Sequence, residues 1–369
     1  MKSYLLFILF GLVALGAVAG TAFIGAPEAS LAPTGLGERA LPKFDQDGVR
    51  QIKLARGDQS VLLTRGSTGY WEVPAEGNYP ANDVVSTALQ VAASLQVDDR
   101  LPASAADLAS YGLDDAHGLR VSLSGASAGA TADLIVGLPG PGNRGGYFRH
   151  AGVVEILESF DTRLSQLPLE PRQWLRMQMG LIDAHDLTIH LAKADIQPIS
   201  IVQFKDHWIL QGLQEDSNHQ PIETANPTAL ERVVSLAAGL QCDGIFPLGT
   251  KPDDMGFSPN GPTLVCRNPD SSVVAMVRFG SPRKLPGAHL IDGSDVGEPV
   301  VPMQVAFQVA KDANLGDYPA YFNRQASQRL FWLRQSNFQA LFPAHDQLTV
   351  PVKPKATAPG LLNPLNPLH

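Results

Sequence analysis

The sequence predicts an α+β protein made of two tandem duplicated domains, each an antiparallel sheet with one main packed helix, behind an N-terminal transmembrane helix. Three observations predict it. The segment "VAASLQVD" at 91–98 returns as "LAAGLQCD" at 236–243. Alternating apolar runs precede both copies, as expected of half-buried antiparallel strands. A long apolar run opens the chain.

The N-terminal segment, residues 1–23, carries Lys2 as its one charge. Its apolar stretch, residues 4–23, approaches the ~20 residues that span a bilayer. We expect an uncleaved anchor with Lys2 in the cytoplasm, because apolar residues continue to Ile24. A signal peptide cleaved after Ala17-Val18-Ala19 is the alternative. The protein is then either a single-pass protein of the bacterial cytoplasmic membrane, with most of its chain in the periplasm, or a soluble periplasmic protein.

The first repeat domain is expected at 45–168, after a linker at 24–44 that is rich in Pro, Ala and Gly. Two alternating runs lead to Trp71, and Val84, Val85, Ala88, Leu89, Ala92 and Leu95 follow at helical spacing.

The second repeat domain is expected at 169–343, with matching runs before Trp208. Its helix should begin at Asn226 and Pro227, because Asn caps helices and Pro fits the first helical position. Downstream, Tyr111-Gly112-Leu113 aligns with Met255-Gly256-Phe257, and "DLIVG" at 133–137 aligns with "MVRFG" at 276–280.

Each copy is expected to end in an aromatic, Arg-bearing helix, at 172–180 and 322–341. "AHDLTIHL" from Ala184 resembles "AHDQLTVPV" from Ala344, which predicts a third copy that begins and then stops. Residues 344–351 are therefore expected to be a closing strand that covers a sheet edge. The Pro-rich tail, residues 352–369, is expected to be extended, or to order only on a partner.

The formal net charge of -8, without a basic cluster, argues against nucleic acid as a partner. The two cysteines, Cys242 and Cys266, fall on a helix end and the following strand. They form either a disulfide in an oxidising compartment or two buried thiols. No metal site is expected, because no His or Cys lies at ligand spacing near them.

Three motifs are compatible with chemistry, but a structural interpretation is favoured for each. Ser127 lies in "GASAG", yet strands flank it where a nucleophile elbow needs a strand and a helix. The Gly-rich stretch 137–146 lacks the Lys of a phosphate loop. His185-Asp186 and His345-Asp346 precede matching strands, where Asp is a common turn residue. We therefore assign no catalytic residue, cofactor or metal ligand.

The candidate binding residues are aromatic or basic. Trp71 and Trp208 occupy the same repeat position. They are either core residues or, if exposed, a surface on which a sugar stacks. Phe331, Trp332 and Arg334 belong to the predicted C-terminal helix, which either packs across its own domain or binds a partner.

The order of motifs resembles the domain-of-unknown-function family numbered 4340. The resemblance rests on the N-terminal membrane segment, then "VRQIKLARGDQSVLL", "GYWEV", "NDVVSTALQVAASLQVDDRL", "ASYGLDDAHGLRVSL", "ADLIVG" and "GGYFRHAGVVEILES". It implies an exported, membrane-tethered protein of the kind often associated with ABC-type transport systems, including some similar to gliding-motility transporters. No catalytic residues are carried over from it.

The favoured function is a non-enzymatic, membrane-anchored periplasmic subunit or assembly factor of an integral-membrane protein complex, such as an ABC-transporter auxiliary. A cell-envelope protein that binds glycan or lipid is the alternative. A hydrolase using Ser127 or a His-Asp pair is a third, less favoured hypothesis.

Overall fold

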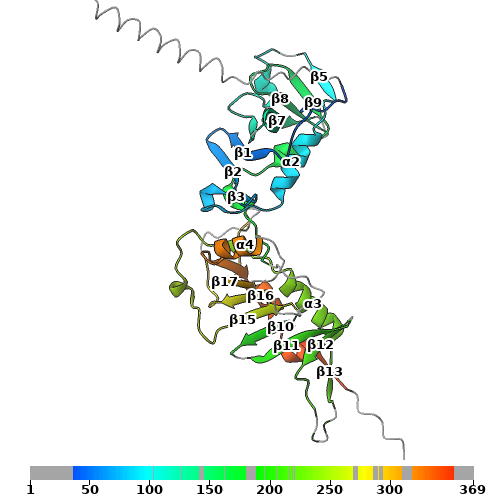
Figure 1. Cartoon of the computed structure of the whole chain (residues 1–369), viewed down its shortest axis with the longest axis vertical. Coiled ribbons are helices and arrows are strands. Elements are labelled where there is room, and N and C mark those ends of the chain that lie inside the picture. The colour runs from blue at the N-terminus through cyan, green and yellow to red at the C-terminus, as the bar shows by residue number, and fades with distance from the viewer. Residues whose placement is uncertain are drawn as a thin grey trace, which may run out of the picture. The chain divides into compact units, whose positions relative to one another are not determined.

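The chain divides into two compact units, residues 1–175 and 176–369 (Figure 1). The computed structural model describes residues 36–352 except 103, 126, 141–144, 162, 180–187, 195, 206, 216, 218, 220, 269–272, 286–289, 291–293 and 310–317. The sequence analysis began the first domain at residue 45. In the structure the folded unit begins earlier, because Arg39 forms a β-bridge with Gln96, and Ala40 and Leu41 are buried.

Unit 1 is built on a nine-stranded sheet in the order β4-β3-β2-β1-β6-β7-β8-β9-β5. Every neighbouring pair is antiparallel. The strands are β1 (Val49–Arg56), β2 (Gln59–Arg65), β3 (Trp71–Val73), β4 (Tyr79–Pro80), β5 (Asp99–Leu101), β6 (Leu119–Gly125), β7 (Ala132–Pro139), β8 (Gly146–His150) and β9 (Ile156–Ser159). Short 3-10 turns connect them: η1 (Pro74–Glu76), η2 (Leu108–Tyr111), η3 (Ala128–Ala130), η5 (Arg163–Gln166) and η6 (Pro171–Trp174).

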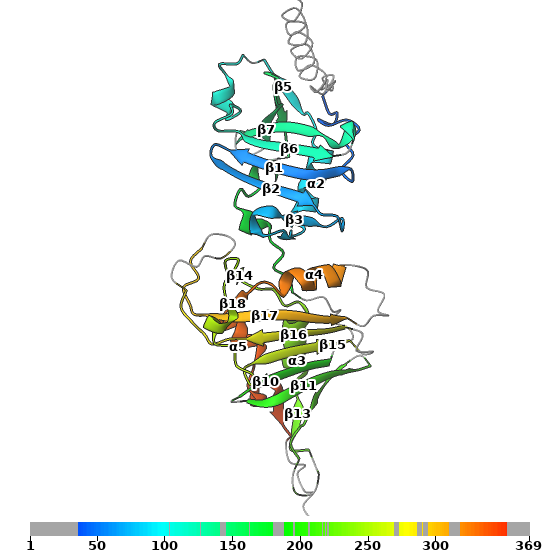
Figure 2. The ribbon, with the colours of Figure 1, turned by 60° about the vertical axis from the view of Figure 1, so that its left-hand side comes forward.

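The main helix of unit 1 is α2 (Val84–Ser94), which lies against one face of the sheet (Figure 2). It buries the apolar side chains that recur at helical spacing, namely Val85, Ala88, Leu89, Val91 and Ala92. Alternate strand residues, such as Ile52 and Leu54 on β1, are buried on the sheet. The predicted antiparallel sheet with one packed helix is therefore present.

A second, smaller core lies at the far end of the unit 1 sheet, where Leu113, Ile135 and Ile156 pack together. The turn that covers it needs Gly112, whose φ is +66°. Gly137 runs so close to the Tyr111 carbonyl that no Cβ would fit between them. The buried Arg149 holds the turn by donating from Nε to the Leu113 carbonyl at 2.8 Å.

Unit 2 is built on an eight-stranded sheet in the order β12-β11-β10-β15-β16-β17-β18-β14. Apart from β4, this repeats the strand order of unit 1, with each sheet opening on a three-strand meander before the main helix. The strands are β10 (Thr188–Lys193), β11 (Ile196–Phe204), β12 (His207–Gln211), β14 (Gly244–Ile245), β15 (Thr263–Arg267), β16 (Val273–Phe279), β17 (Val300–Val309) and β18 (Phe331–Arg334).

The main helix of unit 2 is α3 (Pro227–Ala238), and it begins where the sequence predicts. Asn226 Oδ1 accepts a hydrogen bond from the Ala229 amide, and Pro227 occupies the first turn. Its buried face consists of Leu230, Val233, Val234, Ala237 and Ala238. The sequence pattern therefore located this helix correctly.

The turn over the far end of the unit 2 sheet matches its counterpart in unit 1. Gly256, after η7 (Pro252–Met255), has a φ of +70°, and Gly280 approaches the Met255 carbonyl as Gly137 approaches that of Tyr111. The predicted match of "YGL" with "MGF" and of "DLIVG" with "MVRFG" thus agrees with the local geometry.

The predicted helix at 322–341 is wrong. The chain forms α4 (Tyr318–Ala326), then the strand β18, then α5 (Gln335–Leu341). Leu330, Phe331, Trp332 and Leu333 are all buried, because β18 lies between β17 and β14 inside the sheet. An apolar run buried on both faces is typical of an internal strand, and helical spacing does not distinguish it from a helix.

The predicted helix at 172–180 is also wrong. Only the single turn η6 forms, and Gln178 beyond it bridges Gln241 in unit 2. The division between units therefore falls after Leu175, where the sequence analysis placed it after Pro168.

Residues 344–351 form the short helix α6 (His345–Leu348) and the strand β19 (Thr349–Pro351). β19 pairs with β13 (Glu223–Ala225) in a separate two-stranded sheet, so it does not extend the main sheet as a closing strand would. The Asn226 amide donates to the Leu348 carbonyl at 2.8 Å, just as the Asn82 amide donates to the Trp174 carbonyl at 2.8 Å. The segment therefore corresponds to η6 of unit 1 and does not begin a third copy.

No helix among the described residues is long and apolar enough to span a membrane. The predicted anchor at 1–23 and the tail from residue 353 lie outside the described residues.

Candidate functional site

The two copies of the repeated segment end the main helices and then pair, through isolated β-bridges, with the segment that opens each unit. In unit 1 the Val97 amide donates to the Glu38 carbonyl at 2.9 Å. In unit 2 the Cys242 amide donates to the Met177 carbonyl, also at 2.9 Å. Both copies then place an aspartate, Asp98 or Asp243, beside the end of the last long strand of the sheet.

Asp243 is the hub of the unit 2 site. Its carboxylate accepts from the Arg334 backbone amide at 2.7 Å, from Arg334 Nε at 3.1 Å, and from Asn337 Nδ2 at 2.9 and 3.1 Å. Its side chain is 12% exposed. Because donors occupy both of its oxygens, this carboxylate holds Arg334 and Asn337 in place.

Asp98 makes a simpler version of the same contact. Its carboxylate accepts from the Phe160 backbone amide at 2.7 Å. The cation nearby is Arg163, and both its Nε and its Nη2 bind Asp161. Burial raises and these hydrogen bonds lower the pKa of Asp161, and the hydrogen bonds from Arg163 have the larger effect, so the pKa lies below its ordinary value.

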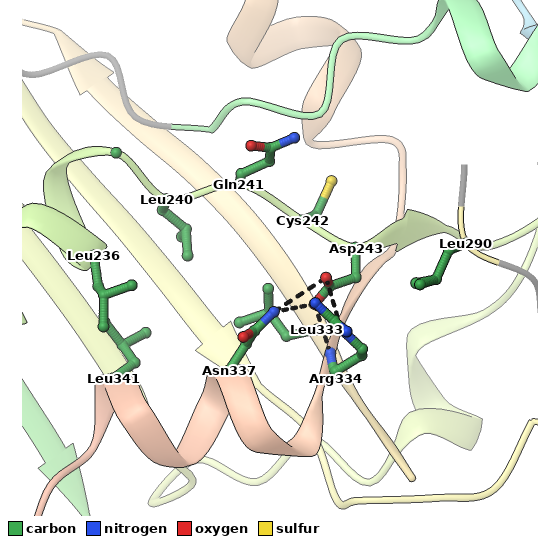
Figure 3. Close-up of a pocket in the computed structure, with 11 residues that line it drawn as sticks. Leu236, Leu240, Gln241, Cys242, Asp243, Leu290, Leu333, Arg334, Asn337 and Leu341 are labelled. Atoms are coloured by element: carbon green, nitrogen blue, oxygen red, sulfur yellow. Dashed lines mark hydrogen bonds and ion pairs between the residues drawn. The ribbon is translucent and has the colours of Figure 1, made fainter. Parts of the chain in front are cut away.

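A pocket of about 630 Å³ opens beside Asp243. Figure 3 shows Leu236 of α3 facing Leu341 of α5, while Asn337 and Arg334 point at Asp243. Leu240, Leu333 and Leu341 are buried, and Leu236 at the rim is 37% exposed. The pocket thus combines leucine side chains with a few polar groups, as ligand sites commonly do.

A pocket of about 580 Å³ lies at the equivalent place in unit 1, beside Asp98. Its lining includes the polar side chains of Ser94, Gln96, Ser159 and Asp161, and Phe160 at its rim is 71% exposed. The two sites therefore share a position and an aspartate but differ in their lining.

The cysteines lie near the unit 2 site as buried free thiols, the second of the two alternatives that the sequence leaves open. Cys242 Sγ lies 3.3 Å from the Met177 carbonyl and points away from Asp243 (Figure 3). Burial raises the pKa of Cys266 to about 12 and that of Cys242 well above its ordinary value. Neither thiol is therefore a nucleophile at neutral pH.

Of the predicted binding residues, Arg334 is the one that lines a pocket described here. Trp71 and Trp208 are half-buried, and each stands on the third strand of its meander. Phe331 and Trp332 are 0% and 4% exposed and belong to the core of unit 2. Asn337, Leu236 and Leu341 were missed, although the repeated "LQxD" segment marked their neighbourhood.

The motifs compatible with chemistry do not assemble into a site among the described residues. Ser127 Oγ lies 3.5 Å from Asp45 Oδ2, and Ser127 precedes the turn η3. His345 Nε2 binds Glu223 Oε1 at 2.7 Å and so joins α6 to β13. His185 and Asp186 lie outside the described residues, as do 141–144 of the Gly-rich stretch. Within the described ranges, no three His, Cys, Asp or Glu residues gather as metal ligands.

Comparison with known protein families gives a match. A family model described as "Domain of unknown function (DUF4340)" matches residues 71–259. This range begins at Trp71, contains both copies of the repeated segment and ends just after the Met255-Gly256-Phe257 turn. No curated protein and no solved structure matches the chain.

Proposed function

The chain belongs to the DUF4340 family, a domain of unknown function, and we propose on that basis that it is a binding protein without catalytic activity. Its role is that of a subunit or assembly factor of an integral-membrane protein complex, such as an ABC-transporter auxiliary. The observation that carries the proposal is Phe160, an aromatic side chain 71% exposed at the rim of the unit 1 pocket. Exposed aromatics that border a hollow are typical anchors of protein interfaces.

The proposal includes a location. Residues 4–23 tether the chain to the bacterial cytoplasmic membrane, and the two units lie in the periplasm. The support is the apolar N-terminal sequence. Cleavage of this segment would give a soluble periplasmic protein with the same two units.

The proposal also includes an origin, namely tandem duplication of one ancestral unit. It is supported by the common strand order, by the equivalent Asn82 and Asn226 hydrogen bonds, and by the paired Asp98 and Asp243 contacts. After duplication each copy kept the aspartate that positions its pocket, while the linings diverged. One chain then offers a partner two different contact sites.

The test is affinity purification of the tagged full chain from detergent-solubilised membranes, followed by mass spectrometry. We expect a stoichiometric integral-membrane partner with the wild-type chain and with Phe204→Ser, a control at a 52% exposed phenylalanine of unit 2. Phe160→Ser should reduce its recovery several-fold. Recovery of no membrane protein, or equal recovery with Phe160→Ser, would count against the proposal.

A second candidate function is the binding of a cell-envelope ligand, glycan or lipid. The leucine-lined pocket beside Asp243 favours it, because its size and apolar lining are those of a small-molecule site. The half-buried Trp71 and Trp208, which the sequence offered as a sugar platform, line none of the pockets described here.

A further inference from the structure

The unit 2 pocket combines an aliphatic surface with one cation whose position is fixed. The aliphatic surface comes from Leu236 of α3, which is 37% exposed at the rim. Beneath it lie the more buried leucines of the lining, namely Leu240 after α3, Leu333 of β18 and Leu341 of α5. These side chains offer only hydrocarbon. A ligand that gains from covering them must carry a flexible apolar part, since the apolar area removed from water supplies the affinity.

The cation is Arg334, which is oriented by its own unit. Nε donates to Asp243 at 3.1 Å, and the backbone amide is tied to the same carboxylate. The two terminal Nη groups have no partner among the described residues, and the side chain is 37% exposed. Glu298, another acid bound near the start of α5, is already taken by the Ser336 amide and hydroxyl. A guanidinium held in this way presents paired donors suited to a carboxylate or a phosphate.

The equivalent site of unit 1 lacks both properties. There the guanidinium of Arg163 is occupied by Asp161. The residue whose amide binds the aspartate is Phe160 where unit 2 has Arg334, and the residue before it is Ser159 where unit 2 has Leu333. The combination in unit 2 is therefore not a general by-product of the fold.

We infer that the pocket beside Asp243 binds an anionic amphiphile, with a carboxylate or phosphate group on the Arg334 guanidinium and an aliphatic chain over Leu236, Leu240 and Leu341. This inference rests on the second candidate function and names its ligand class. Two sources share this chemistry, a free fatty acid and a phospholipid.

The test is calorimetric titration of the full chain, held in amphipol so that no detergent micelles compete. The probes are dodecanoate, dodecyl phosphate and dodecyl maltoside, which share one alkyl chain and are used below their micelle-forming concentrations. We expect the two anions to bind one per chain and at least about ten-fold more tightly than the neutral maltoside, the size of effect of a charged hydrogen bond. Tighter binding of the carboxylate indicates a fatty acid, and tighter binding of the phosphate a phospholipid.

Variants separate the contribution of the Arg334 charge from that of the apolar contact with Leu236. Arg334→Gln should weaken both anions about ten-fold or more but leave the maltoside unchanged, which also shows that the pocket is still folded. Leu236→Ser should weaken all three probes about three- to ten-fold. The matched controls Arg267→Gln and Leu248→Ser, at an exposed arginine and an exposed leucine outside the pocket, should leave every affinity within about two-fold.

Three results would overturn the inference: no saturable binding of either anion, equal affinity for all three probes, or anion affinities that Arg334→Gln leaves unchanged. Failure here leaves the protein-partner proposal standing, because that proposal is read from co-purification and from Phe160 in the other unit. Conversely, loss of the membrane partner with Phe160→Ser would leave the titrations unaffected.

Discussion

Asp243 joins three parts of unit 2 through one carboxylate: the end of α3, the last residue of β18 and the first turns of α5. Asp98 makes only the backbone contact to Phe160. An aspartate at the same repeat position therefore makes more hydrogen bonds in unit 2 than in unit 1. The difference comes from the residues that meet it, Arg334 and Asn337, which lie far along the chain.

Asp243→Ala is expected to destabilise unit 2 by about 2–3 kcal/mol, because it leaves the Arg334 and Asn337 donors without their charged acceptor. Asp98→Ala should cost about 1 kcal/mol in unit 1, for one lost backbone contact. Urea unfolding of the full chain measures both. Equal costs for the two variants would show that the Arg334 and Asn337 contacts contribute little.

Gly137→Ala and Gly280→Ala are each expected to cost about 1–3 kcal/mol, because the new Cβ would overlap the carbonyl oxygen of Tyr111 or Met255. Gly129→Ala is the control, since its nearest neighbour would lie 3.2 Å from the added Cβ. Thermal unfolding of the three variants gives the comparison. A tolerated Gly137→Ala would mean that the turn at Tyr111 moves without penalty.

At the scale of elements, the contact of α6 with β13 depends on pH through Glu223. Burial raises the pKa of Glu223, but hydrogen bonds from His345, the Gln214 amide and Thr349 lower it further, so the folded pKa lies below the ordinary 4.5. A lowered folded pKa contributes stability that is present above pH 4.5 and is lost as the pH falls through the folded value.

We therefore expect the protection of the paired Thr224 and Val350 amides against hydrogen exchange to fall as the pH drops below 4.5. Glu223→Gln should remove this local dependence, whereas Glu231→Gln, at an exposed position on α3, should keep it. Protection factors corrected for the intrinsic pH effect are the measurement. A wild-type chain whose local protection is flat over this range would contradict the role of Glu223.

Elements with clear periodicity could be predicted from sequence, and those decided by distant contacts could not. The meander strands, both main helices and the Asn226 cap follow from local patterns. The run Leu330–Leu333 became a strand only because β17 and β14 lie on either side of it. The pocket was likewise hidden, because Asn337 and Leu341 meet Asp243 from nearly one hundred residues along the chain, and the segment "LQxD" marks only its near wall.

At the scale of the whole molecule, the boundary between the units falls between the last contact within unit 1 and the first contact within unit 2. Trp174 is fully buried in unit 1 and donates from Nε1 to the Pro168 carbonyl at 2.9 Å, whereas the Met179 amide pairs with Leu240 in unit 2. No change in composition marks this boundary, because Trp174 and Met179 are both buried apolar residues. A sequence pattern therefore could not locate it, and repeat alignment placed it after Pro168.

A fragment of residues 36–175 is expected to unfold cooperatively and to be about 3–5 kcal/mol more stable than a fragment of residues 36–168, which lacks Trp174 and the contacts of Asn82 to η6. Extending the fragment to residue 179 should add nothing, because Met177 and Met179 pair within unit 2. Urea unfolding of the three fragments, monitored by tryptophan fluorescence and circular dichroism, measures these stabilities. Equal stability of the two shorter fragments would place the boundary before η6.

The way each unit secures its two ends determines how it bears mechanical tension. Each opening segment pairs beside the C-terminal end of the main helix, and each closing segment pairs beside the N-terminal end. A pull along the chain therefore loads these short pairings before it loads the sheet. Stretching a single molecule should give small early extensions, from release of residues near 38–40 or 349–351, ahead of one large rupture per sheet. Under a small load the end segments would then detach and lengthen the chain while both sheets stay folded.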